Sequence, residues 1–105
     1  MPKKPIKKLS PLHPGEVLRE EFLVPLALSP GALAKAMNVP RTRVERIAAE
    51  SSGITADTAL RLSNALGTSA QLWLNLQNRY DVEAAQRAIG KQIAKIKRVT
   101  ADAAE

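Results

Sequence analysis

The segment of residues 29–49, SPGALAKAMNVPRTRVERIAA, constrains the fold of this chain more than any other part of it. Ser29 can cap a first helix, because its hydroxyl can accept a hydrogen bond from a free N–H of the first turn. Asn38 can end that helix, since asparagine tolerates the left-handed backbone conformation. Pro40 can open a second helix without losing a hydrogen bond. The segment therefore predicts two short helices joined by a tight turn.

The apolar positions of these two segments indicate that the helices pack against each other. In the first, Leu33, Ala34 and Met37 fall on one face, and in the second Val44 and Ile47 are three residues apart and face inward. Ala34 is small, as is needed where two helices cross at a steep angle. This pattern is typical of a helix-turn-helix motif.

Long hydrogen-bond donors without apolar partners occupy the other faces of the second helix: Arg41, Thr42, Arg43 and Arg46. The formal net charge of +6 is weaker evidence for nucleic-acid binding, because most of the excess lies near the two ends of the chain. Residues 14–82 hold seven basic and seven acidic side chains. The local arginine cluster is therefore the better indicator of a DNA-binding surface.

Composition favours an all-α fold in a single small domain with tails. Aliphatic residues dominate the 105-residue chain, which has one Trp, one Tyr and one Phe, so a helical bundle is more easily built than a β-sandwich. The absence of cysteine excludes disulfides and thiolate chemistry. No apolar run approaches the length of a membrane span, and the basic start of the chain lacks the apolar core of a signal peptide. We expect a cytoplasmic protein.

The segments before and after the motif have their own helix signals. Residues 1–12 predict a mobile basic tail, which is either a solubilising arm or an arm that contacts DNA or a partner. A first helix starts at His13 and ends at Pro25; His13 is expected to cap or pack, because no cysteine or second histidine could join it at a metal. Another helix is expected between the N-cap Thr55 and the C-terminal Gly67.

An apolar stripe marks a fifth helix that begins after Thr68 or Ser69. Its members recur at helical spacing: Leu72, Trp73, Leu76 and Tyr80. The stripe either completes the core or forms a dimer surface, with Trp73, Leu76 and Tyr80 as the interface candidates. Asp81 is a possible cap for a further basic amphipathic helix over residues 82–98, which can dock on its own bundle, pair with a second subunit or bind another protein. Residues 99–105 are expected to fray.

Three stretches together resemble the HigA (VapI-type) antitoxins of bacterial toxin–antitoxin modules: HPGEVLREEFL at 13–23, LAKAMNVPRTRVERI at 33–47 and GITADTALRLSNALGTSAQLWLNLQNRYD at 53–81. The resemblance covers roughly residues 11–98. The motif itself resembles that of lambda-repressor-like (Xre/Cro-CI) proteins. This chain differs from many such relatives in its loop, which reads Glu50-Ser51-Ser52 where theirs is commonly basic.

The resemblance implies a five- to six-helix lambda-repressor-like DNA-binding domain over residues 13–81 with a C-terminal helix. It also implies a dimer that binds a palindromic operator in its own promoter and neutralises a HigB-type ribonuclease toxin. Arg41, Thr42, Arg43 and Arg46 would contact bases in the major groove. Ser29 and Thr55, at helix N-termini, would hold phosphates.

Two other functions remain open, and enzymatic activity is not expected. The chain could be a stand-alone repressor without a toxin, or a protein-interaction module with little affinity for DNA. No glycine-rich phosphate loop or paired-carboxylate pattern occurs, and the acids lie on predicted solvated faces: Glu16, Glu20, Glu21, Glu45 and Asp57. We therefore predict no catalytic residue, no metal site and no cofactor.

Overall fold

The computed structural model describes residues 11–100, and this part of the chain is helical without any strand. Its elements are α1 (Pro14–Val17), η1 (Leu18–Leu23), α2 (Pro30–Met37), α3 (Arg41–Ala48), α4 (Ala56–Leu66) and α5 (Ala70–Ile93). The π-helical η1 follows α1 directly, so the two form one rod. The expected all-α fold is confirmed. Most of the tail predicted at 1–12, and residues 101–105 of the one predicted at 99–105, lie outside the described residues.

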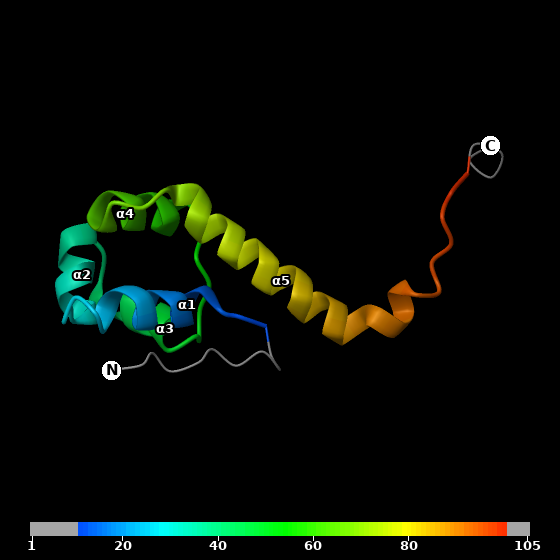
Figure 1. The fold of residues 1–105 in the computed structure, drawn as a ribbon, viewed down its shortest axis with the longest axis horizontal. Coiled ribbons are helices and arrows are strands. Elements are labelled where there is room, and N and C mark those ends of the chain that lie inside the picture. Colours follow the sequence, from blue (N-terminus) through cyan, green and yellow to red (C-terminus); the bar gives the residue numbers. More distant parts are fainter. Residues whose placement is uncertain (1–10, 101–105) are drawn as a thin grey trace.

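The first four α-helices form a bundle, and α5 runs from this bundle outward (Figure 1). Helix α2 packs on α3, α4 packs on α5, and α1 contacts both α3 and α5. The first part of α5 therefore belongs to the bundle, whereas its second part projects away from it.

Helix ends form where the local chemistry predicts them. Ser29 and Thr55 accept hydrogen bonds from backbone N–H groups in the first turns of α2 and α4, at 3.1 and 3.3 Å. Ser69 caps α5 in the same way, at 3.0 Å. Asn38 and Gly67 end α2 and α4 in the left-handed conformation, with φ of 57° and 73°. These caps confirm the predicted boundaries of α2 and α4 and the predicted start of α5.

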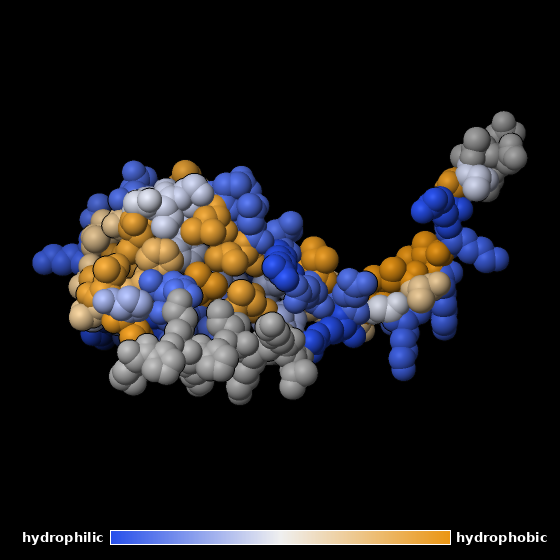
Figure 2. Space-filling model, in the orientation of Figure 1, coloured by the Kyte–Doolittle hydropathy of each residue, from blue (hydrophilic) through white to orange (hydrophobic). Residues whose placement is uncertain are grey.

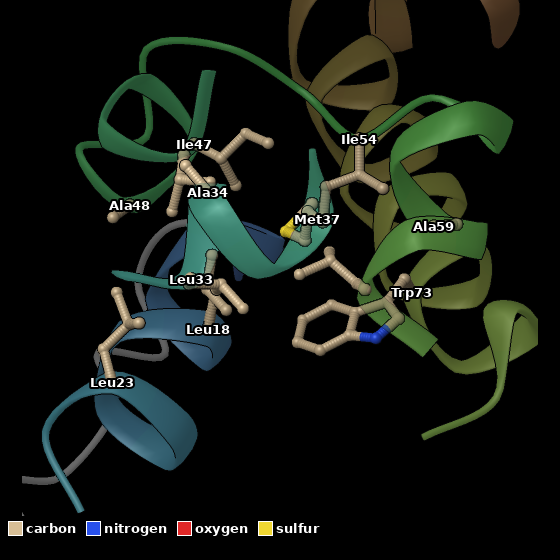
Figure 3. Packing of buried hydrophobic residues seen from close by; sticks show 12 residues of the cluster. Leu18, Leu23, Leu33, Ala34, Met37, Ile47, Ala48, Ile54, Ala59 and Trp73 are labelled. Carbon is tan, nitrogen blue, oxygen red and sulfur yellow. The ribbon is translucent and has the colours of Figure 1, made fainter. Parts of the chain in front are cut away.

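One hydrophobic core holds the bundle together, and all of its helices contribute to it (Figure 3). Trp73 of α5 is fully buried, and its indole N–H donates to the Thr68 hydroxyl at 2.7 Å. Its ring lies against Phe22, with 5.4 Å between ring centroids. The other large side chains that are fully buried are Pro14, Leu18, Leu33, Val44, Ile47 and Leu62.

Trp73 of the apolar stripe at the start of α5 therefore serves the core, and its burial corrects the prediction of Trp73 as a dimer-interface residue. Trp73 exposes none of its surface and has nothing to offer a second subunit. Leu76 is partly buried against the same core. Tyr80 is partly exposed, and its ring meets the His13 ring edge to face at 4.8 Å between centroids.

The prediction of a separate helix over residues 82–98 is wrong in its start and its end, because the helical residues of α5 run without a break through Asp81 and Val82, and α5 ends at Ile93. Asp81 lies within it and caps nothing; its carboxylate accepts a hydrogen bond from the Gln77 side chain at 2.9 Å. The helix is kinked at Ile89, with φ −125° and ψ 17°, next to Gly90. Residues 96–100 have no regular structure.

The start of α1 is built by His13 and Gly15 of the HPGE stretch. The N–H of Gly15 donates to Nδ1 of the buried His13 at 2.8 Å. A Cβ at Gly15 would lie 1.7 Å from the backbone carbonyl oxygen of Ile47. The N-terminus of α1 thus touches the backbone of α3, and this contact fixes the end of the helix that carries the arginines.

Burial lowers the pKa of His13 from its ordinary value near 6.5, and the positive charge of Arg19 acts in the same direction, against Glu50 and Asp81, which raise it. A proton on Nδ1 would also remove the acceptor that Gly15 uses. Because the pKa of His13 is lower in the folded chain, the unfolded chain binds the proton of His13 more tightly than the folded chain does. We therefore expect the free energy of unfolding to fall as the pH is lowered from 7 through 6.5.

Urea unfolding of the wild type and of His13→Asn at pH 7.0 and 5.5 tests this expectation. Asparagine keeps an acceptor for the Gly15 N–H and does not titrate. The pH dependence should be smaller in the variant; an equal dependence in both chains would assign the effect to other groups.

Candidate nucleic-acid interface

Helix α3 is anchored on one face and leaves the other free. Its inward face is buried through Val44, Ile47 and Ala48. Arg41, Thr42 and Arg46 are exposed, and the side chain of Arg43 keeps 40% of its surface exposed. The structure therefore brings the four predicted base-contacting residues to the outer side of one rigid helix.

The turn before α3 fixes the angle at which the helix is presented. The N–H of Val39 donates to the carbonyl of Ala34 at 3.0 Å, and the side chain of Ala34, which belongs to α2, is buried. A Cβ at Gly31 would lie 3.2 Å from Cδ of Arg41. The aliphatic part of the Arg41 side chain thus lies over the first turn of α2, close to the Ser29 cap.

The arginines of α3 differ in what holds them. Arg41 pairs with Glu45 one turn along the same helix, with Nε to Oε2 at 3.3 Å, and its side chain is 71% exposed. Arg43 reaches a different helix: its Nη1 lies 3.5 Å from Oδ2 of Asp57 in the first turn of α4. Arg43 is therefore connected to the body of the domain, whereas Arg41 is paired within α3 alone.

Asp57 is itself held by Arg61. Nε of Arg61 donates to the two carboxylate oxygens at 2.7 and 3.1 Å, and its Nη1 donates to the carbonyl of Met37 at 2.8 Å. The hydrogen bond from Arg61 is the main reason why the pKa of Asp57 lies below its usual value, and the charges of Arg61 and Arg43 lower it further. Asp57 is thus an ionised bridge between α3, α4 and the end of α2.

The two predicted phosphate-holding residues flank α3. Ser29 precedes the first turn of α2, over which the side chain of Arg41 lies. Thr55 precedes Asp57 by two residues. Both side chains are exposed, and both already cap their own helices. The N-termini of α2 and α4 are anion-binding positions in general, because their free N–H groups and helix dipoles favour negative charge.

The acidic loop residue Glu50 forms an internal ion pair. Its carboxylate lies 3.1 Å from Nη2 of Arg19, and Nη1 of the same guanidinium donates to the Ala48 carbonyl at the end of α3. From the other side, the side chain of Gln77 in α5 accepts a hydrogen bond from the N–H of Ile54 at 2.7 Å. Glu50 therefore helps to fix the C-terminal end of α3 to the rod of α1 and η1.

Asp57 and Arg61 have roles at this surface that were not predicted from the sequence. Their i, i+4 spacing on a helix was a visible signal for an ion pair. Asp57 contacts Arg43 and Arg61 contacts Met37, and each of these contacts joins two different helices. The local residue spacing does not predict such contacts.

Nothing in the described part of the chain points to catalysis or metal binding. Within residues 11–100, no group of three or more His, Asp or Glu side chains could hold a metal ion. No helix there is both long and apolar enough to cross a membrane. An open, mainly apolar pocket lies between η1 and α2, and the one ionisable residue in its lining is Arg19.

Several curated proteins are similar to most of this chain, whereas no family model matches it. Virulence-associated protein I of Dichelobacter nodosus is 54% identical over 76 residues, which are 72% of this chain and 70% of that protein. Antitoxin HigA-1 of Vibrio cholerae is 39% identical over 75 residues, 71% of this chain and 70% of that protein. This chain belongs to the HigA antitoxin family.

A solved HigA structure has the same fold. Pseudomonas aeruginosa antitoxin HigA, determined with the higBA promoter, matches with a TM-score of 0.82 and 47% sequence identity, over 86% of this chain and 99% of that one. The match confirms the resemblance to HigA and the expected fold. Membership of a family of antitoxins and transcriptional regulators also agrees with the expectation that this chain is not an enzyme.

Proposed function

We propose that this chain is a DNA-binding antitoxin that represses its own operon and neutralises a HigB-like ribonuclease toxin in the cytoplasm. The observation that carries the proposal is the match to a HigA protein determined with promoter DNA, at 47% identity over 86% of this chain. Helix α3 is buried on its inner face, and the exposed arginines on its outer face supply the chemistry for such binding.

In this proposal α3 enters the major groove of a palindromic operator with its N-terminal residues facing the base edges. Arginine can donate two parallel hydrogen bonds to a guanine, which discriminates against other bases by about 1–3 kcal/mol. Arg41, Arg43 and Arg46 are the candidates for this contact, with Thr42 beside them. Ser29 and Thr55 would place phosphates at the N-termini of α2 and α4.

A homodimer is part of the proposal, because a palindrome presents two equal half-sites about 34 Å apart. The projecting part of α5 supports it. There Val82, Ile89 and Ile93 are 55%, 42% and 42% exposed and recur at spacings of seven and four. Figure 2 shows orange hydrophobic surface beside blue hydrophilic surface along this part of the chain. We propose that a second copy covers these residues, with Leu76 and Tyr80 near the inner end of the contact.

A titration against the DNA upstream of the gene tests the proposal. We expect tight binding to this duplex and weak binding to a scrambled duplex of equal length. If about six phosphates are neutralised, affinity should fall by roughly a thousandfold between 50 and 200 mM salt. Co-expression with the neighbouring gene tests the toxin, and a stable complex that relieves growth arrest is the expected result.

Two results would contradict the proposal in different ways. Equal, weak binding to both duplexes would favour a protein-interaction module in which the helix-turn-helix is a scaffold. Specific DNA binding without any complex with the neighbouring gene product would leave a stand-alone repressor.

A further inference from the structure

The outer face of α3 is linked to α4 through a single carboxylate. Asp57 is the one acidic residue of α4, and it lies in the first turn, next to the Thr55 cap. Arg43 and Arg61 approach it from two helices, at 3.5 and 2.7 Å. A negative charge at this place is unexpected in a surface that meets phosphates, since it would repel them.

The charges around Asp57 remove that difficulty. Two guanidinium groups surround one carboxylate, so the cluster of Arg43, Asp57 and Arg61 keeps a net positive charge. The pKa of Asp57 is lowered mainly by the Arg61 hydrogen bond, so the carboxylate stays ionised at neutral pH. Asp57 therefore weakens the electrostatic attraction of this surface for phosphates only a little. We look for its role in the geometry of the side chains that it binds.

We propose that Asp57 is a positioning residue that holds the guanidinium of Arg43 in the direction required for base recognition. The inference rests on the proposed function. In it, Asp57 touches no base, but discrimination at the base pair contacted by Arg43 depends on Asp57. Arg61 keeps the carboxylate in place, because it binds Asp57 and the carbonyl of Met37 at the same time, at 2.7 and 2.8 Å.

Preorganisation gives this arrangement its effect. A free arginine side chain loses rotamer entropy when it is fixed on a base, and a partner that fixes it beforehand reduces this loss. Nη1 makes the contact with Asp57, and a guanidinium has five N–H donors in a fixed fork. Enough donors remain for a bidentate contact with guanine.

Arg41 provides an internal comparison. Its partner Glu45 lies on the same exposed helix, and the Arg41 side chain is 71% exposed against 40% for Arg43. The guanidinium of Arg41 is therefore held in position less firmly than that of Arg43. Removing the charge of Glu45 changes the net charge of the interface as much as removing that of Asp57, so Glu45→Gln is a matched control.

The experiment measures the affinity of five chains for a panel of operator duplexes in which each base pair of the half-site is changed in turn. The chains are the wild type, Arg43→Ala, Asp57→Asn and the double variant, with Glu45→Gln as the control. We expect Asp57→Asn to lose at least about fivefold discrimination at the base pair where Arg43→Ala loses it, and at no other. The double variant should lose no more there than Arg43→Ala alone.

Other outcomes would contradict the proposed role of Asp57. If Asp57→Asn and Glu45→Gln both change affinity equally for every duplex, Asp57 acts through charge alone and the inference is overturned. Additive losses in the double variant would also overturn it. Circular dichroism shows whether Asp57→Asn is folded, and Asp57→Glu replaces it if it is not. Glutamate displaces the carboxylate, so discrimination at the same base pair should again fall. Unchanged discrimination in Asp57→Glu would overturn the inference. A wild type that prefers no duplex of the panel would overturn the proposed function itself, and with it this inference.

Discussion

Replacing Gly15 by alanine is expected to destabilise the protein by at least about 3 kcal/mol. The new Cβ would lie 1.7 Å from the carbonyl oxygen of Ile47 and 2.9 Å from its carbonyl carbon. Both are backbone atoms, so no rotamer change can relieve the overlap. Helix α1 or α3 would have to move, and the buried contacts of Leu18 with the core would be disturbed with it.

Gly90→Ala is the matched control for this substitution. A Cβ at Gly90 would meet no atom within 4 Å, and the residue lies inside α5. Alanine there should stabilise the chain by about 0.5–1 kcal/mol, because it lowers the entropy of the unfolded state. Urea unfolding followed by circular dichroism measures both variants. Equal midpoints for Gly15→Ala and the wild type would show that α1 does not rest on α3 as described.

The helix-turn-helix could be predicted from the sequence because its signals are local. Ser29, Asn38 and Pro40 act through their own backbone conformation or through a hydrogen bond to the next turn. The need for glycine at position 15 could not be predicted, since it comes from a contact with Ile47, which is distant in the chain. Local chemistry thus defined the ends of the motif, whereas the contact that supports it from behind required the tertiary structure.

The same distinction explains the error in α5. Asp81 is a good helix-capping residue by type, which favoured a break there. In the structure its carboxylate accepts a hydrogen bond from Gln77 one turn earlier, and the helix continues. A capping residue within a long amphipathic pattern therefore does not define a boundary unless a turn residue accompanies it, as Gly67 does before α5.

In the candidate interface, some features could be predicted from the sequence and others could not. Arg41, Thr42, Arg43 and Arg46 could be selected from the sequence because they are polar positions on a helix whose other face is apolar. The bridge from Arg43 through Asp57 to Arg61 could not, because it joins α3 to α4 and to the end of α2. Sequence patterns can therefore select the residues of a surface, but not the contacts that hold them in position.

Truncating Trp73 to alanine should lower the free energy of unfolding by about 3–5 kcal/mol, as expected for a large aromatic side chain removed from a core. Trp73 is fully buried, lies against Phe22 and donates its indole N–H to Thr68. The cavity would open between α5 and the bundle. The loss should be the same at low and high protein concentration, because the side chain stabilises its own subunit.

Ile93→Lys separates this core role from the proposed dimer contact. Ile93 is 42% exposed on the projecting part of α5, so lysine there leaves the bundle intact. We expect an unchanged circular dichroism spectrum and a halved mass by light scattering, since a charge in an apolar contact is costly when it is covered. If Trp73→Ala instead yields a folded monomer and Ile93→Lys stays dimeric, the assignment of the two parts of α5 is reversed. Helix α5 is unbroken from Ala70 to the kink at Ile89, so its first half is held by the bundle and its second half carries exposed apolar residues away from the bundle, where a second subunit can cover them.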